Sequence, residues 1–244
     1  MPIYSIFRMK NHALLMALSA AYPVIGYSAG AAQIDFATGA VTAVSSSGAQ
    51  RPLVKGAEIS NGDTIRTGDG GRAQVRFSDG ALISLQPTTE FRVDNYEFSN
   101  QPTGQEKGFF SLIKGGMRTI TGLIGRSNRD NYKVTTSVAT IGIRGTHFGA
   151  LLCQADCGSV QNATGSAPAD GLHVDVTSGS VSVTNAGGQT LVNAGQFGFV
   201  PNAATPPAVV PPSQGIQVTM PPSIAQNKGT GSTVGTGDGS ECRL

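Results

Sequence analysis

The sequence has few of the residues that long helices or charge-driven disorder require. Only 13% of its 244 residues are charged, Trp is absent, and 17 Lys and Arg face 15 Asp and Glu. A strongly charged disordered chain and a collagen-like repeat are excluded, because the first needs a large net charge and the second needs Gly at every third position. The chain instead contains 33 Gly and 13 Pro, which are costly inside helices. The composition therefore predicts an all-β protein rich in turns.

Short alternating runs broken by glycine occupy residues 33–200. In the clearest example, residues 73–77 alternate apolar and polar side chains, and Asp79-Gly80 leads into a second apolar run. A period of two with a turn dipeptide between the runs is typical of a half-buried hairpin. No window of helical length has a sustained period of 3.6 residues. We therefore expect one β domain over residues 33–200.

A repeated glycine spacing in the sequence bears on how these strands stack. Gly39 is followed 17 residues later by Gly56, Gly179 is followed 16 residues later by Gly195, and a weaker copy begins at Gly115. Recurring strand–turn units of this length are typical of coiled β architectures. The alternative is that such patterns are frequent in any glycine-rich β protein. The sequence leaves open a solenoid-like or a sandwich-like stack of short strands.

Residues 1–32 have the pattern of a secretory signal peptide. Arg8 and Lys10 precede an apolar run, which small residues follow. An uncleaved membrane anchor is the alternative, but a span needs about 20 apolar residues, and this shorter run contains Pro23. Cleavage predicts a periplasmic or secreted bacterial protein without a stable transmembrane span. It leaves 15 basic and 15 acidic residues, so no nucleic-acid partner is expected.

The last part of the chain, residues 201–244, differs in composition. Pro-Pro pairs are followed by a stretch rich in Gly, Ser and Thr. Such a segment buries too little apolar area to offset its chain entropy, which predicts a flexible Pro/Gly-rich tail. Cys242 in this tail is expected to be a free thiol or an intermolecular partner.

The other two cysteines are expected to pair in an oxidising compartment. Cys153 and Cys157 lie close enough in sequence to form a local disulfide at the base of a loop. Zinc is the alternative, with His147 and His173 as further ligands, although the His residues lack the close spacing of structural zinc sites. We expect no metal and no cofactor.

Catalytic constellations are sparse, so the protein is predicted not to be an enzyme. His173 is expected on a solvated strand face, and no Gly-x-Ser-x-Gly elbow accompanies it. An exported carbohydrate-active enzyme or a glycan-binding protein is the alternative function. The enzyme would need two carboxylates in one cleft. The candidates for that pair are Asp63, Asp69, Asp79, Glu90, Asp94 and Glu97.

Basic residues outnumber acidic residues between positions 106 and 133. An anionic envelope polymer or an acidic protein surface could dock on such a region. The alternative is a solvated face without a function. The candidate partner patch consists of Lys114, Arg118, Arg126 and Arg129.

Three ordered motifs carry a family resemblance. They are a Gly-Asp-Thr-Ile-Arg-Thr turn at 62–67, an alternating strand that ends in Asp79-Gly80, and an Ile-Arg-Gly-Thr-His-Phe block at 143–148. Their order within residues 56–150 resembles the FecR-domain family of bacterial envelope proteins. Ser137 departs from the family, which often has Pro there. The motif residues expected to be structural are Gly62, Asp63, Thr67, Asp79, Gly80, Arg144, Gly145 and Thr146.

The third motif suggests two further details. Gly145 is expected to carry a β-bulge that resets the alternation of its strand. Arg144, between two glycines in an apolar strand, is expected to be clamped by a carboxylate or a carbonyl group.

The resemblance implies an all-β, solenoid-like periplasmic domain without enzymatic activity. In the iron-uptake regulators of this family, the domain senses an outer-membrane receptor, and a cytoplasmic helical segment controls a sigma factor. Only about ten residues precede the apolar run here, so direct sigma-factor control is not expected. We expect a non-catalytic binding or scaffold module whose partner is an unidentified envelope protein or glycan.

Overall fold

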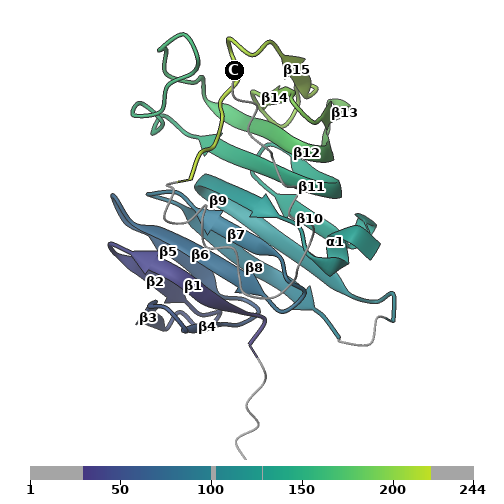
Figure 1. The fold of residues 1–244 in the computed structure, drawn as a ribbon. Helices are drawn as coiled ribbons and strands as arrows, with labels where there is room; N and C mark the ends of the chain where they lie inside the picture. Colours follow the sequence, from purple (N-terminus) through teal and green to yellow (C-terminus); the bar gives the residue numbers. More distant parts are fainter. Residues whose placement is uncertain (1–29, 100–102, 128, 221–244) are drawn as a thin grey trace, which may run out of the picture.

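The computed structural model describes residues 30–99, 103–127 and 129–220, and strands dominate them (Figure 1). The all-β prediction is confirmed. A short helix, α1 (Leu123–Ser127), and a 3-10 turn, η1 (Arg129–Asn131), connect two of the strands. No helix among the described residues is long and apolar enough to cross a membrane. The strands are β1 (Ala32–Thr38), β2 (Val41–Val44), β3 (Gln50–Pro52), β4 (Glu58–Ile59), β5 (Thr64–Thr67), β6 (Arg72–Phe77), β7 (Leu82–Leu85), β8 (Glu90–Glu97), β9 (Lys107–Ile120), β10 (Tyr132–Thr135), β11 (Thr140–Cys153), β12 (Gly171–Asn185), β13 (Gly188–Asn193), β14 (Phe197–Val200) and β15 (Ala208–Val210).

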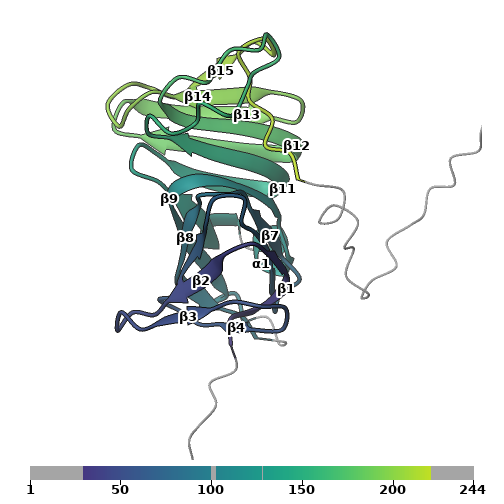
Figure 2. The same cartoon turned by 90° about the vertical axis from the view of Figure 1, so that its left-hand side faces the viewer.

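These strands form one hydrogen-bonded sheet that folds over into two facing layers (Figures 1 and 2). Layer A contains β14, β7, β6, β1 and β4, with the second halves of β9 and β11 and the first half of β12. Layer B contains β13, β10, β8, β5, β2 and β3, with the other halves of the long strands. The sheet is mixed, because β10 pairs with β9 in parallel. The architecture is therefore a sandwich whose long strands belong to both layers.

The long strands change layers at glycines with positive φ. These are Gly115 in β9, Gly145 in β11 and Gly179 in β12, with φ values of 77°, 60° and 75°. The register of β11 against β12 shifts between Arg144 and His147, which confirms the predicted bulge at Gly145. A Cβ atom on Gly179 would overlap the carbonyl oxygen of Gly145. The corners of β11 and β12 therefore stack without room for a side chain.

The repeated glycine spacing in the sequence corresponds to these corners. Gly39, which lies between β1 and β2, has a φ of 65°, and like Gly115 and Gly179 it marks a passage from one layer to the other. Gly56 and Gly195, which end the two clear copies, also have positive φ. The repeated unit is thus a layer-changing corner, a strand and a tight turn.

One hydrophobic core fills the space between the layers. Phe77 of layer A contacts Tyr96 and Phe110 of layer B, with ring centroids 5.0 and 5.2 Å apart. Phe110 also contacts Phe91 and Tyr132 at 5.5 and 5.3 Å. All five rings are buried, and such aromatic pairs contribute beyond the apolar area that they bury. This cluster joins the two layers along their inner faces.

The folded region continues past Val200, the predicted end of the domain. β15 pairs with β14, and Ile216 and Val218 are buried. At the other end Ala32, the last residue assigned to the signal peptide, begins β1 and is buried. The rest of the predicted signal peptide up to residue 29, and residues 221–244 with Cys242, lie outside the described residues.

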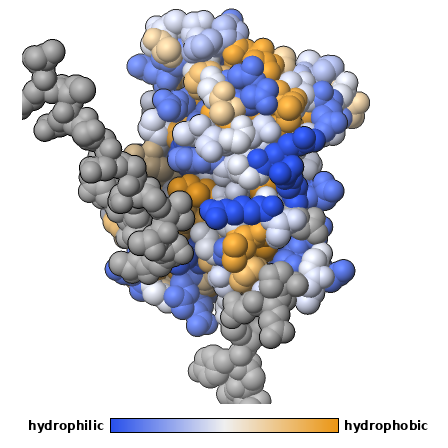
Figure 3. All heavy atoms as spheres, turned by 45° about the vertical axis from the view of Figure 1, so that its right-hand side comes forward, coloured by the Kyte–Doolittle hydropathy of each residue, from blue (hydrophilic) through white to orange (hydrophobic). Residues whose placement is uncertain are grey.

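The outer surface has no large apolar patch on the face that Figure 3 displays. Strongly hydrophilic residues gather across the middle of that face, and hydrophobic residues form separate groups above and below. The large hydrophobic residues that are exposed are spread over the chain: Val54, Ile113, Ile120, Leu123, Leu191 and Val209.

The two stacked corners give a matched pair of variants. Gly145→Ala should cost about 1–2 kcal/mol of unfolding free energy, because a Cβ is strained at positive φ but meets nothing within 4 Å. Gly179→Ala should cost about 1–3 kcal/mol more, since its Cβ would also overlap Gly145. Urea denaturation of both variants measures the difference. Equal costs would contradict the stacked-corner description.

Candidate functional site

Asp63 of the first motif ties β3 to the turn before β5. Its carboxylate accepts hydrogen bonds from two guanidinium nitrogens of Arg51, at 3.2 and 2.5 Å, and from the N–H of Ser60 at 2.8 Å. Arg51 also donates to the carbonyl of Glu58 at 2.9 Å. The hydrogen bond to Asp63 raises the pKa of Arg51 above its ordinary value. A buried carboxylate that is fully paired in this way holds the turn. Gly62 before it has a φ of 84°.

Asp79 of the second motif joins three elements. Its Oδ1 accepts hydrogen bonds from the N–H of Ala81 and from the hydroxyl of Tyr96, both at 3.1 Å. Its Oδ2 accepts one from the N–H of Ile124 at 3.2 Å. Burial raises the pKa of Tyr96, which keeps the phenol protonated as a donor. Asp79 thus holds the hairpin turn at Gly80, β8 and the start of α1 together.

The two motif threonines make internal links of different kinds, Thr67 through its hydroxyl and Thr146 through its backbone N–H. The hydroxyl of Thr67 donates to the carbonyl of Gln86 at 2.6 Å and accepts from the N–H of Thr89 at 2.9 Å. The N–H of Thr146 donates to the hydroxyl of Thr121 at 3.0 Å. Both threonines are buried, and the Thr146 hydroxyl itself has no hydrogen-bond partner among the described residues.

Arg144 does not form the clamp that its position in the sequence suggested. Its side chain is exposed and makes no hydrogen bond or ion pair with any residue that the structure describes. Ile141 and Ile143 point into the core, and the alternation of β11 therefore turns Arg144 to the outer face of layer B. This residue is available to a ligand.

A shallow groove of about 660 Å³ lies beside Arg144 on the outer face of layer B. Strand pairing builds it: Lys133 of β10 lies opposite Gly142, and Thr140 lies opposite Thr184. Gly142 has no side chain, and a Cβ there would meet only the carbonyl oxygen of Ser182, at 3.8 Å. We call this surface the layer B groove. Its polar lining consists of Arg129, Asp130, Lys133, Thr135, Thr140, Arg144, Ser182, Thr184 and Gln189.

The layer B groove carries more positive than negative charge. Arg129, Lys133 and Arg144 are exposed and face one carboxylate, Asp130. None of the three cations forms an ion pair with a carboxylate in the described ranges. The Lys133 ammonium also lies 5.8 Å from the centroid of the Phe109 ring. Such an array attracts anions, and the arginine side chains can bind carboxylates in a bidentate manner.

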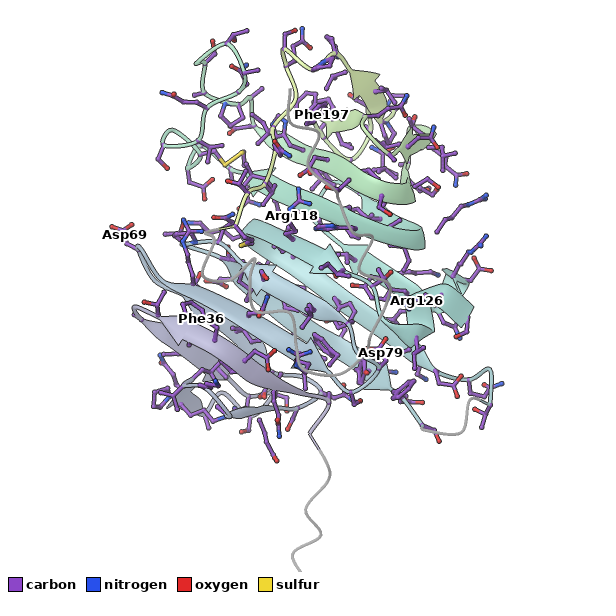
Figure 4. All side chains as sticks on the ribbon, viewed as in Figure 1. Phe36, Asp69, Asp79, Arg118, Arg126 and Phe197 are labelled. Carbon is purple, nitrogen blue, oxygen red and sulfur yellow. A yellow bond between two sulfur atoms is a disulfide. The ribbon has the colours of Figure 1, made fainter. Side chains whose placement is uncertain are left out.

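The structure separates the residues of the predicted basic patch. Arg118 is almost buried in layer A and pairs with Asp175, and Lys114 pairs with Asp156 at 3.3 Å. Arg126 lies in α1, well apart from Arg118 (Figure 4). Only Arg129 lines the layer B groove.

The predicted disulfide between Cys153 and Cys157 is present, with Cα atoms 5.5 Å apart. The zinc alternative thereby loses both thiolates, and no cluster of three or more metal-ligating residues occurs in the part of the chain that is described. His173 is buried, contrary to the expected solvated position. Its Nε2 lies 2.8 Å from the carbonyl oxygen of Ala169, and its ring packs against Phe199 at 4.7 Å. Burial lowers the pKa of His173.

The six candidate carboxylates have separate environments. Asp63 and Asp79 serve the turns described above, and Asp69 is exposed at a loop tip, far from Asp79 in Figure 4. Glu90, Asp94 and Glu97 pair with Arg66, Arg92 and Lys107 respectively. None of the six lines the layer B groove.

Asp79→Ala tests the link between β7, β8 and α1. It should cost about 2–4 kcal/mol of unfolding free energy, because three donors lose their acceptor in a buried place. Asp69→Ala removes the same charge from an exposed loop and should change stability by less than about 0.5 kcal/mol. Chemical denaturation measures both. A loss for Asp79→Ala as small as that of the control would rule out the joining role.

Comparison with protein families matches the description "FecR protein" over residues 63–182. This range begins at Asp63 and extends to Ser182, so it includes the corner glycines of β9, β11 and β12 and much of the layer B groove. Comparison with curated proteins finds no match.

Two crystal structures of a proposed anti-sigma factor from Parabacteroides distasonis are similar to this chain. Each is 17% identical with a TM-score of 0.45, and the alignment covers 60% of this chain and 58% of that protein. The chain thus matches little more than half the length of that relative.

The family match supports a FecR-like sensing or regulatory module, and the regulatory character of the family fits a protein that is not an enzyme. The motif residues Asp63, Thr67, Asp79 and Thr146 all make hydrogen bonds within the fold. Residues 63–182 of this chain thus belong to the FecR protein family.

Proposed function

We propose that this chain is a non-catalytic FecR-like binding module of the bacterial cell envelope, and that the layer B groove binds an acidic partner. The observation that carries the proposal is the set of exposed cations in that groove. Arg129, Lys133 and Arg144 converge there from η1, β10 and β11, without ion-pair partners among the described residues. A carboxylate-bearing ligand would supply the missing negative charge.

The shape of the groove suits an extended ligand. The glycine at position 142 leaves the middle of the floor open, so that a ligand can approach the backbone of β11. Hydroxyl groups of Thr140 and Ser182 flank this point and can donate or accept hydrogen bonds. Cations attract the ligand, and the hydroxyl groups orient it.

An acidic segment of a partner protein is the ligand that fits a regulatory family best. An anionic glycan is a second candidate, which the row of hydroxyl groups favours. Two soluble polymers separate these candidates: polyglutamate represents an acidic peptide, and polygalacturonate represents an acidic glycan. Binding of either candidate ligand requires no catalytic activity.

Affinity electrophoresis of the purified protein in gels that contain each polymer tests the proposal. Polyglutamate should retard the protein, and the double variant Lys133→Glu/Arg144→Glu should bind about 10-fold more weakly, since two attractions become repulsions. Retardation should also fall with added salt.

Arg126→Glu is the matched control for the single variant Arg144→Glu, because each replaces one exposed cation by a carboxylate and Arg126 does not line the groove. Binding should fall much less for Arg126→Glu than for Arg144→Glu. Equal losses would indicate attraction to net charge alone and would refute the groove. Stronger retardation by polygalacturonate would favour the glycan.

Export of the protein to the periplasm or beyond is part of this proposal. Arg8, Lys10 and the apolar run after them support it. N-terminal sequencing of the exported protein should find a start near Ala31 to Gln33. An intact Met1 in the membrane fraction would show an anchor instead.

A further inference from the structure

A segment near the C-terminal end of the described chain crosses the outer face of layer A. This segment, residues 215–220, is called the strap, and Figure 1 shows it in yellow in front of the sheet. Ile216 and Val218 are buried, whereas Gln217 and Thr219 are exposed. The strap is therefore an extended segment with every second side chain against the sheet.

An ion pair of layer A binds the main chain of the strap. The N–H of Val218 donates to Asp175 Oδ2 at 3.0 Å, and the carbonyl of Val218 accepts from Arg118 Nε at 2.6 Å. Arg118 also pairs with Asp175 and donates to Thr177 at 2.8 Å. The side chains of Asp175 and Arg118 are only 4% and 12% exposed. These hydrogen bonds involve only main-chain atoms of Val218, so an extended segment with another side chain at this position can form them as well.

The floor beneath the strap is shaped for close approach. A Cβ atom on Gly149 of β11 would lie 2.7 Å from the Cβ of Val218 and would overlap the Asp175 carboxylate. Ile216 and Val218 also pack with Leu151 and the Cys153–Cys157 disulfide in a small apolar cluster. The sheet thus offers a built site for an extended peptide.

The strap does not fill this site. A cavity of about 380 Å³ remains between the strap, the disulfide loop and the adjoining strands. Leu151, Cys157, Val160, Ile216 and Val218 form the apolar part of its wall, and most of the remaining lining is polar, including Arg72, Gln86, Asp156 and Gln161. An occupant with a larger side chain than Ile216 would bury more apolar surface there.

We propose that this cleft is a binding site for an extended segment of a partner protein, which the strap occupies as the chain's own ligand. The partner segment presents a small β-branched residue over Gly149 and a larger apolar residue two positions earlier. Its backbone takes the place of Val218 between Arg118 and Asp175. This site lies on the opposite layer from the groove and is independent of the proposed function.

Fluorescence anisotropy with a labelled peptide of residues 214–220, Gln-Gly-Ile-Gln-Val-Thr-Met, which contains the strap, tests the exchange on the full chain. Val218→Asp in the protein should release the strap, because it places a carboxylate beside Asp175. The peptide should then bind this variant on the order of 100-fold more tightly than the unchanged chain, whose tethered strap competes. Gln217→Asp, at an exposed position, is the matched control and should behave like the unchanged chain.

Altered peptides test the chemistry without changing the protein. Pro in place of the peptide's Val should abolish binding, since it removes the N–H that Asp175 accepts. Phe in place of the peptide's Ile should bind about 10-fold more tightly by filling the cavity.

Three outcomes would overturn the proposal. The first is a folded Val218→Asp chain, with the same circular dichroism as the control, that binds none of the peptides. The second is equal binding of the Pro peptide. The third is oligomer formation by the unchanged chain through strap exchange, which would make a second copy the occupant. If the Val218→Asp variant does not fold, hydrogen exchange at the Val218 N–H of the unchanged chain is measured with and without the Phe peptide. No increase in the exchange rate with the peptide would also overturn the proposal.

Discussion

The fold depends on the passage of single strands from one layer to the other. β9, β11 and β12 each build part of both layers, and each bends at a glycine whose φ is positive. The corners of β11 and β12 lie so close that Gly179 has no room for a Cβ against Gly145. Because the same strands close both layers, the aromatic core around Phe77 and Phe110 forms without a separate element to join the layers.

This arrangement leaves two outer faces with different chemistry. The outer face of layer B presents hydroxyl groups around Gly142 and exposed cations that pair with no carboxylate in the part of the chain that the structure describes. The outer face of layer A holds a buried ion pair, Arg118 and Asp175, which binds the main chain of Val218 in the strap. An open groove suits a ligand that arrives by electrostatic attraction, whereas a covered cleft selects for shape and backbone geometry.

The local features of the fold could be predicted from the sequence, and the long-range ones could not. The Asp79-Gly80 hairpin, the bulge at Gly145 and the Cys153–Cys157 disulfide each depend on residues that are close in the chain. Arg118 contacts Asp175 and Val218 at separations of 57 and 100 residues, which no local pattern reveals. The alternation that buries Ile141 and Ile143 exposes Arg144, but only the pairing of β10 with β11 brings it to the groove. Burial of His173 likewise depends on the distant Phe199.

The bent strand β11 also contributes residues to both faces. Arg144 lies in the groove and Gly149 lies beneath the strap, five residues along one strand and on either side of the corner. A ligand that favours one angle of this corner would change the fit of the other ligand, and thermodynamic reciprocity makes the effect equal in both directions. A single bent strand would then be enough for a small β protein to couple ligand binding at one surface to ligand binding at the other.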